Sequence, residues 1–251
     1  MKRTYSHLAA TVCLAIFSCI FMQAQIIDTK EGPFVENDTT FLRKIYYQFP
    51  NESHTHSLYI ETDRNSEEYQ EYLGTLYDAD SEIPQLLSSA GTVCRKYGEL
   101  SADSAKELNG IYLPLHKYRG KYYLYNSSAC KTWKQIESPF LICQYQDGPY
   151  LYGITHIEQT SASSYHLQTD DCINNMYNSV KALDIYIIDE EKGIYVWKSQ
   201  TEKEVCYDLY VEKSKAGAFD LINWLVIELE DEFDKFEPID YEEIIRQKKL
   251  F

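Results

Sequence analysis

The chain lacks the glycine motifs shared by most nucleotide-binding enzymes. Its 251 residues include only 10 glycines, and none of them forms a G-x-G-x-x-G turn, a phosphate loop or a G-x-S-x-G nucleophile elbow. The H-E-x-x-H motif is also missing, and no two cysteines have the C-x-x-C spacing of zinc knuckles and thioredoxin-like sites. We therefore expect no cofactor, and an enzyme only if its catalytic residues are dispersed along the chain.

Positive charge is scarce as well. Lysine and arginine total 24 against 39 aspartates and glutamates, which gives a formal net charge of −15. Proteins that bind nucleic acid present a basic field to the phosphate backbone. Because the lysines here are few and scattered, we expect no nucleic-acid partner.

Long apolar runs are absent except at the N-terminus. Lys2 and Arg3 precede an apolar stretch of about 15 residues, which ends at Met22 and is followed by Ala24. This is the order of a secretory signal, and the stretch is shorter than the roughly 20 residues that a membrane-spanning helix needs. We predict a signal peptide over residues 1–24, no membrane span, and export to the periplasm, the outer-membrane surface or the medium. Lipid attachment at Cys19 is the alternative to cleavage after Ala24.

Cysteine remains sparse after the predicted cleavage. An oxidising compartment permits disulfides, and we expect one or two bridges with a spare thiol, although the pairing cannot be read from the sequence. The five cysteines concerned are Cys94, Cys130, Cys143, Cys172 and Cys206.

Most of the mature chain has the period-two pattern of β-strands. Residues 25–39 show no sustained period and are interpreted as a lead-in segment, and residues 40–251 as a single β-rich domain. Helical spacing predicts a helical insertion at about 66–109. Asp240 and Glu243 form a capping-box pattern that predicts a C-terminal helix over Tyr241–Lys249.

Turn residues between the apolar runs predict hairpins. Tyr118-Arg119-Gly120, Asp147-Gly148 and the stretch 189–193 each separate two strand-like segments, and Asp-Gly is one of the strongest short hairpin signals. About eight to ten strands joined by short turns form an antiparallel meander, which closes into a barrel or folds as a sandwich. The fold class predicted is mainly β, with a calycin-like barrel as the fold-level expectation.

Two short patterns carry weak resemblances. Asp38-Thr39-Thr40 and Asp103-Ser104-Ala105 resemble the O-glycosylation acceptors of exported Bacteroidetes proteins, which implies residence in the envelope or outside the cell and no particular activity. His54-Thr55-His56 with Glu61 partly resembles the cupin H-x-H…E signature. The glycines that bracket that signature are missing, so we interpret His54 and His56 as solvated histidines at a strand entrance and predict no metal site.

Tyrosine is the residue most in excess, with 23 tyrosines against 10 phenylalanines. A tyrosine ring can stack on a sugar or another ligand while its hydroxyl stays hydrated. We expect a non-catalytic module that binds a small apolar ligand or a glycan. An envelope structural protein with a protein partner, or a hydrolase with dispersed acidic residues, is the alternative. The candidate ligand-binding residues are the strand-borne Tyr122, Tyr123, Tyr125, Tyr145, Tyr150, Tyr152 and Tyr195.

Overall fold

The structure is a computed structural model that describes residues 25–49, 52–74, 85, 87–88, 106–127, 132–145, 148–171, 179–225 and 233–249. Its contacts divide the chain into two units. The first consists of Met1–Tyr59 and Trp224–Glu228, and the second of Ile60–Asn223 and Leu229–Phe251. The predicted signal peptide lies outside the described residues, and each unit is considered by itself.

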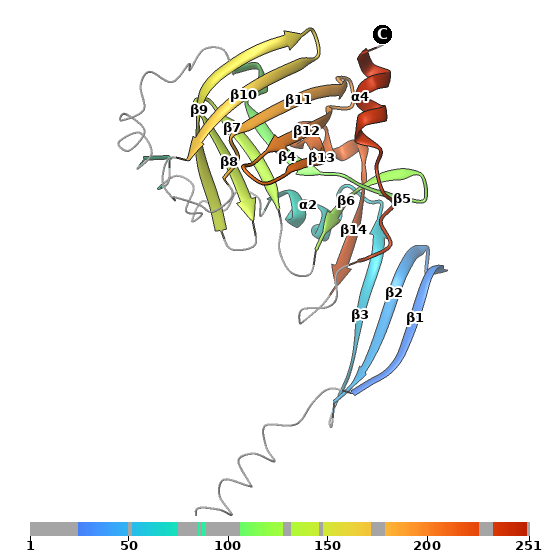
Figure 1. Ribbon diagram of the computed structural model, residues 1–251. Helices are drawn as coiled ribbons and strands as arrows, with labels where there is room; N and C mark the ends of the chain where they lie inside the picture. The colour runs from blue at the N-terminus through green and yellow to red at the C-terminus, as the bar shows by residue number, and fades with distance from the viewer. Residues whose placement is uncertain are drawn as a thin grey trace, which may run out of the picture. The chain divides into compact units, whose positions relative to one another are not determined.

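A closed barrel of eight strands forms the larger part of the second unit (Figure 1). All neighbouring strands are antiparallel, and β13 pairs with β4 to close the barrel. The strands are β4 (Gly110–Pro114), β7 (Trp133–Glu137), β8 (Phe140–Tyr145), β9 (Gly148–Ser161), β10 (Ser164–Asp171), β11 (Ala182–Asp189), β12 (Ile194–Gln200) and β13 (Val205–Glu212). The mainly β fold class is therefore confirmed, and of the two architectures left open the structure is a barrel.

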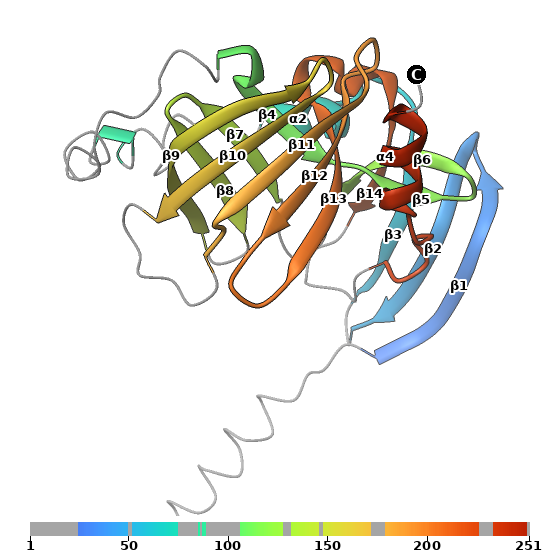
Figure 2. The ribbon, with the colours of Figure 1, turned by 45° about the horizontal axis from the view of Figure 1, so that its top comes forward.

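Consecutive barrel strands are also spatial neighbours, as the predicted meander requires (Figure 2). The hairpins β8–β9 and β11–β12 are present, and Gly148 pairs with Tyr145 at the start of β9. Gly148 therefore belongs to β9, whereas the prediction placed it in the turn. Asp147 itself lies outside the described residues.

One excursion interrupts the meander between β4 and β7. The predicted strand from Ile111 to His116 leaves the barrel after Pro114, and the chain then forms the hairpin of β5 (His116–Tyr118) and β6 (Lys121–Asn126). Arg119 and Gly120 turn this hairpin with φ values of 48° and 77°, the positive φ that such a tight turn needs. β6 pairs in parallel with β14 (Asp220–Leu225), and the meander pattern did not predict this pair because no short turn connects parallel strands.

The barrel interior is filled by a buried cluster to which all eight strands contribute. Aromatic rings dominate it: Trp197 lies with its ring centre 4.9 Å from that of Tyr112 and 5.1 Å from that of Tyr210. A second cluster packs Val196 and Val211 on the other side of the strands against Tyr69 and further residues. Period-two alternation thus places one set of side chains inside the barrel and the other under the surrounding elements.

Short helices cover part of the barrel exterior. α2 (Glu67–Gly74) lies in the predicted 66–109 insertion, and its Tyr69 amide donates to the Ser66 hydroxyl at 3.2 Å. Residues 85, 87 and 88 are also helical, and the turn η3 (Lys106–Leu108) follows. Residues 75–84, 86 and 89–105 lie outside the described residues. α4 (Tyr241–Lys249) has the predicted bounds, and the Glu243 amide donates to Asp240 Oδ1 at 2.9 Å, which confirms the cap.

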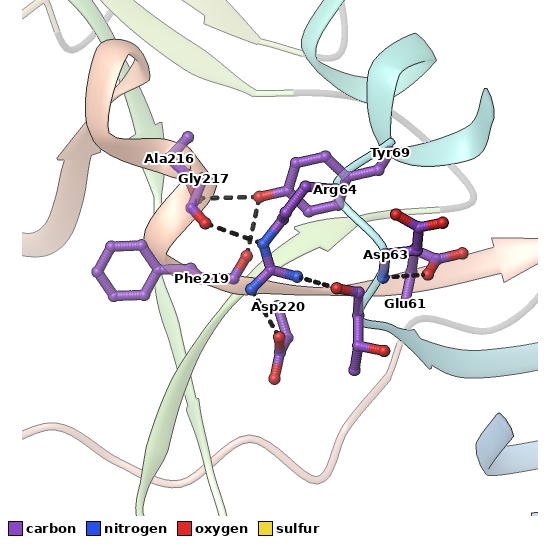
Figure 3. Close-up of polar contacts among 9 residues, drawn as sticks. Glu61, Asp63, Arg64, Tyr69, Ala216, Gly217, Phe219 and Asp220 are labelled. Atoms are coloured by element: carbon purple, nitrogen blue, oxygen red, sulfur yellow. Dashed lines mark hydrogen bonds and ion pairs between the residues drawn. The ribbon is translucent and has the colours of Figure 1, made fainter. Parts of the chain in front are cut away.

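A polar clamp joins the start of α2 to the turn η4 (Lys213–Ala218), as Figure 3 shows. The Arg64 guanidinium donates to the carbonyls of Gly217 and Thr62 at 2.9 and 2.8 Å and to Asp220 Oδ1 at 2.7 Å. The Tyr69 hydroxyl lies 2.9 and 2.8 Å from the carbonyls of Ala216 and Phe219. Because the Arg64 guanidinium and the Tyr69 hydroxyl are both engaged with backbone carbonyls or Asp220, we assign the clamp a structural role.

The first unit is built on β1 (Gln25–Glu36), β2 (Thr39–Gln48) and β3 (Ser53–Glu61), in that order. β1 occupies most of the segment predicted to be a lead-in. Nearly all residues of β1 are exposed, so the strand does not need the alternation of apolar and polar residues that burial of one face requires. Its backbone pairing with β2 holds the strand in the sheet, together with the ion pair between Glu31 and Arg43 at 2.8 Å.

No helix in the described part of the chain is long and apolar enough to cross a membrane. Of the five cysteines considered above, Cys143 and Cys206 are free. Cys94, Cys130 and Cys172 lie outside the described residues, so the predicted disulfides stay a prediction.

Candidate functional site

Four of the seven predicted ligand-binding tyrosines are associated with the barrel interior. Tyr152 and Tyr195 belong to the buried interior cluster, and Tyr150 packs against it. Tyr145 shares their side of the sheet, with its ring centre 5.5 Å from that of Tyr150. These four rings therefore lie in or against the barrel interior, and their predicted role in binding stays a prediction.

The other three predicted tyrosines lie on β6. Tyr123 is buried beside Tyr118, and Tyr122 packs against the cluster outside the barrel. The Tyr125 hydroxyl accepts a bond of 3.1 Å from the Phe233 amide, and its ring touches that of Phe236. The seven tyrosines thus fall in two separate places, so they do not form one binding surface.

A buried ion pair lies at one end of the barrel interior. Lys134 Nζ, on a side chain that is 8% exposed, is 3.2 Å from Asp208 Oδ2, and Tyr210 donates to the same oxygen at 3.4 Å. Burial lowers the pKa of Lys134, but the Asp208 carboxylate and other neighbours outweigh it, so the pKa stays above its ordinary value. Lys134 is therefore held charged, unlike the neutral amine of a lysine nucleophile.

Cys143 stands opposite Lys134 in the β7–β8 register. Burial raises the pKa of its thiol, and the smaller effect of the Lys134 charge does not reverse this. A protonated thiol is a poor nucleophile. This end of the barrel has a charged lysine and a neutral thiol, so it is suited to stability more than to covalent catalysis.

A pocket of about 320 Å³ opens where β4 leaves the barrel, and we call it the seam pocket. It is lined by residues 114–117, by Asp208 and Leu209 of β13, and by Phe236–Ile239 with Tyr241. Two carboxylates line it, Asp208 and Glu237, and each is ion-paired with a lysine. The seam pocket therefore combines aromatic and aliphatic surface with two carboxylates that each contact a lysine.

The first unit carries a larger hollow of about 550 Å³ on one face of its sheet, which we call the sheet hollow. Alternation explains its lining, because Thr55, Ser57 and Tyr59 are two residues apart on β3 and share a face. From β2 come Thr39, Phe41, Lys44 and Tyr46, and Glu36 and Leu225 complete the lining.

Aromatic rings and polar groups alternate around the sheet hollow. The Phe41 ring lies between those of Phe34 and Tyr59, with ring centres 5.7 and 6.1 Å away. Lys44 Nζ sits 3.9 Å from the Phe41 ring centre and 2.9 Å from Glu36 Oε2, and this hydrogen bond lowers the pKa of Glu36. The site therefore offers apolar ring surface beside a charged pair.

Several hydroxyl groups of the sheet hollow have no protein partner. Within the described part of the chain, no side-chain hydrogen bond is formed by Thr39, Tyr46 or Thr55. Hydroxyls that donate and accept, next to aromatic rings, match the hydroxyl-rich surface of a sugar. The sequence pattern did not identify these residues as ligand-binding, because both faces of β2 carry aromatic side chains and neither stands out.

The two histidines of the cupin-like pattern lie on β3, away from the lining of the sheet hollow. His54 Nε2 is 3.1 Å from Glu52 Oε1, and His56 is only 5% exposed and packs on Tyr47. The expectation that His56 is solvated is wrong, because His56 lies within β3 and its side chain is buried. Within the described residues, no three metal-ligating side chains come together.

Comparisons with known proteins add no relative from which a role could be transferred. No protein-family model, no curated protein and no solved structure matches this chain.

Proposed function

We propose that the protein is an exported, non-catalytic binding protein whose first unit binds a carbohydrate in the sheet hollow. The observation that supports it is the lining of this hollow. Rings of Phe41, Tyr46 and Tyr59 lie beside the hydroxyls of Thr39, Tyr46 and Thr55, which form no side-chain hydrogen bond among the described residues. Its volume of about 550 Å³ falls in the range of small-molecule sites, about 300–1,000 Å³.

A glycan array followed by calorimetry tests the binding proposal. On the best glycan, Tyr46→Ala should weaken binding by about tenfold or more through lost stacking. Thr55→Val, which keeps the shape, should weaken it by roughly three- to tenfold, the size of one hydrogen bond. Thr29→Val on β1 is the matched control and should bind as the parent does. Unchanged affinity in both test variants, or hydrolysis of the glycan, would contradict the proposal.

Export has its own support in the N-terminal pattern of Lys2, Arg3, the apolar stretch and Ala24. Together with the Bacteroidetes-like tripeptides it supports a proposed site of action in the periplasm, at the outer-membrane surface or outside the cell. N-terminal sequencing of protein from the native host should find Gln25 first, within a residue or two. An intact Met1 or a lipidated Cys19 would overturn this part.

A protein partner is the second candidate, and β1 favours it. β1 ends its sheet, and within the described residues no strand pairs with its outer edge. Ile26, Ile27 and Val35 are 56%, 57% and 71% exposed there, and an exposed apolar edge is a template for an added strand. A photoreactive residue at position 35 should then crosslink a protein in the native host that the same residue at Glu191 does not.

A further inference from the structure

The seam pocket of the second unit is a separate site from the sheet hollow, and its chemistry differs. Its volume of about 320 Å³ is at the low end of the range for small-molecule sites, about 300–1,000 Å³. The pocket combines aromatic rings with carboxylates and lacks the row of free hydroxyls found in the sheet hollow.

Asp208 is the polar group of this pocket with bonding capacity left. Its Oδ2 atom accepts hydrogen bonds from Lys134 Nζ and from the Tyr210 hydroxyl, both on the barrel side. Its Oδ1 atom has no hydrogen-bond partner among the described residues, and the side chain is 45% exposed. A carboxylate accepts at both oxygens, so Oδ1 is available to a donor in the pocket.

The other charges of the lining neutralise one another. Glu237 Oε2 lies 3.5 Å from Lys117 Nζ, and the Gly120 amide donates to the Glu237 carboxylate at 3.1 Å. Lys134 is buried behind Asp208 and does not line the pocket. A ligand in the seam pocket therefore meets a carboxylate whose Oδ2 atom is bonded to Lys134 and whose Oδ1 atom has no partner among the described residues.

Neighbouring rings hold the aromatic side chains of the pocket in place. Phe236 stacks on His116 with ring centres 4.5 Å apart, and Tyr241 stacks on Tyr207 at 5.7 Å. Fixed aromatic surface beside a carboxylate favours organic cations, which gain both cation–π and ionic contacts. The net charge of −15 raises the local concentration of cations around the whole protein.

We propose that the seam pocket binds a small organic ammonium ion, with the ammonium group at Asp208 Oδ1 and the apolar body against Phe236, Ile239 and Tyr241. This inference does not depend on carbohydrate binding, because the two sites share no residue. Either proposal can fail while the other holds.

Three benzene derivatives of similar size test whether binding requires a positive charge on the ligand. Calorimetry or ligand-observed NMR should find benzylamine bound about tenfold more tightly than benzyl alcohol, because a charge-assisted bond replaces a neutral one. Benzoate should bind least, and added salt should weaken benzylamine binding most. Equal affinity for benzylamine and benzyl alcohol, or tighter binding of benzoate, would overturn the proposal.

Two variants locate the bound probe. Ile239→Trp fills the seam pocket and should weaken benzylamine binding by about tenfold or more, whereas Val205→Trp, an exposed site on β13 outside the lining, should not. The double variant Asp208→Asn with Lys134→Met removes the carboxylate and also its buried lysine partner, so no buried charge is left without a counterion. It should abolish the preference for benzylamine over benzyl alcohol. If the preference persists in this folded double variant, the assignment to Asp208 is wrong.

Discussion

The two units use aromatic residues in opposite ways. The barrel places Tyr112, Tyr152, Trp197 and Tyr210 in a filled interior, where their rings pack on one another. The sheet of the first unit presents Phe41, Tyr46 and Tyr59 to a hollow of about 550 Å³. An excess of tyrosine therefore does not identify a binding surface by itself, because the same residue type builds a core in one unit and lines a hollow in the other.

The ion pairs of the two units are alike in exposure. The Lys134 side chain is 8% exposed and that of Asp208 45%, and the values for Lys44 and Glu36 are 12% and 46%. In both pairs the lysine is the more buried partner. Removing its carboxylate leaves a charge with little access to water, whereas a lost lysine leaves a carboxylate that water can reach.

The largest expected effect is the loss of stability in Asp208→Ala. This change leaves the Lys134 ammonium buried without its carboxylate, and we expect the free energy of unfolding to fall by about 3–5 kcal/mol. Lys134→Met should lower the free energy of unfolding by less, because the Asp208 side chain is 45% exposed and water can hydrate its carboxylate. Urea denaturation followed by circular dichroism measures both variants. Asp208→Ala as stable as the parent would show that the pair is not buried as described.

Alkaline titration tests the packing of the barrel tyrosines. A bond to Glu107 raises the pKa of Tyr165 to about 12, and burial raises that of Tyr210 well above its ordinary value. The unfolded pKa is about 10, so these tyrosines contribute full stability below that pH and lose it as the pH rises through the folded values.

The tyrosinate absorbance of the native protein should therefore rise late, and its last part should accompany loss of near-ultraviolet circular dichroism. Urea-unfolded protein is the control and should titrate in one step near pH 10. A native curve that coincides with the unfolded one would contradict the buried interior.

A smaller effect is expected at the β8–β9 hairpin. Gly148 has a φ of 130°, which other residues rarely adopt. Gly148→Val should lower the free energy of unfolding by about 1–3 kcal/mol through backbone strain. Equilibrium denaturation checks this, and a variant as stable as the parent would show that the strand does not need this backbone conformation.

The smallest stability effect should come from Tyr46→Ala, since its ring lines an open hollow. We expect a loss below about 1 kcal/mol, together with the loss of glycan affinity described above. A thermal melt and calorimetry on the same sample separate the two effects. A large loss of stability would mean that Tyr46 is part of the core of its unit.

Local patterns in the sequence predicted the local structure well. The capping box gave the bounds of α4, and turn residues located the hairpins β5–β6 and β11–β12. Tertiary pairing was harder to predict. The parallel partner of β6 is about a hundred residues away in the sequence, and β1 shows no alternation because nearly all of it is exposed.

The candidate sites could be predicted only in part. Alternation shows that Thr55, Ser57 and Tyr59 share a face, but not whether that face is covered. Tyr150 was predicted to bind a ligand, and its side chain is half-buried against the barrel interior, a position that strand alternation alone does not reveal. The seam pocket depends on β4 leaving the barrel after Pro114, and no residue pattern marks that exit.

The central claim is that the first unit binds the ligand through its sheet hollow and that the barrel tyrosines build a core. Amide chemical-shift mapping of the labelled protein during a titration with the best array glycan tests this directly. The account predicts that the largest shifts cluster at Phe41, Tyr46, Thr55 and Tyr59. Shifts centred on Tyr145, Tyr150 and Tyr152, with the sheet hollow unaffected, would contradict it.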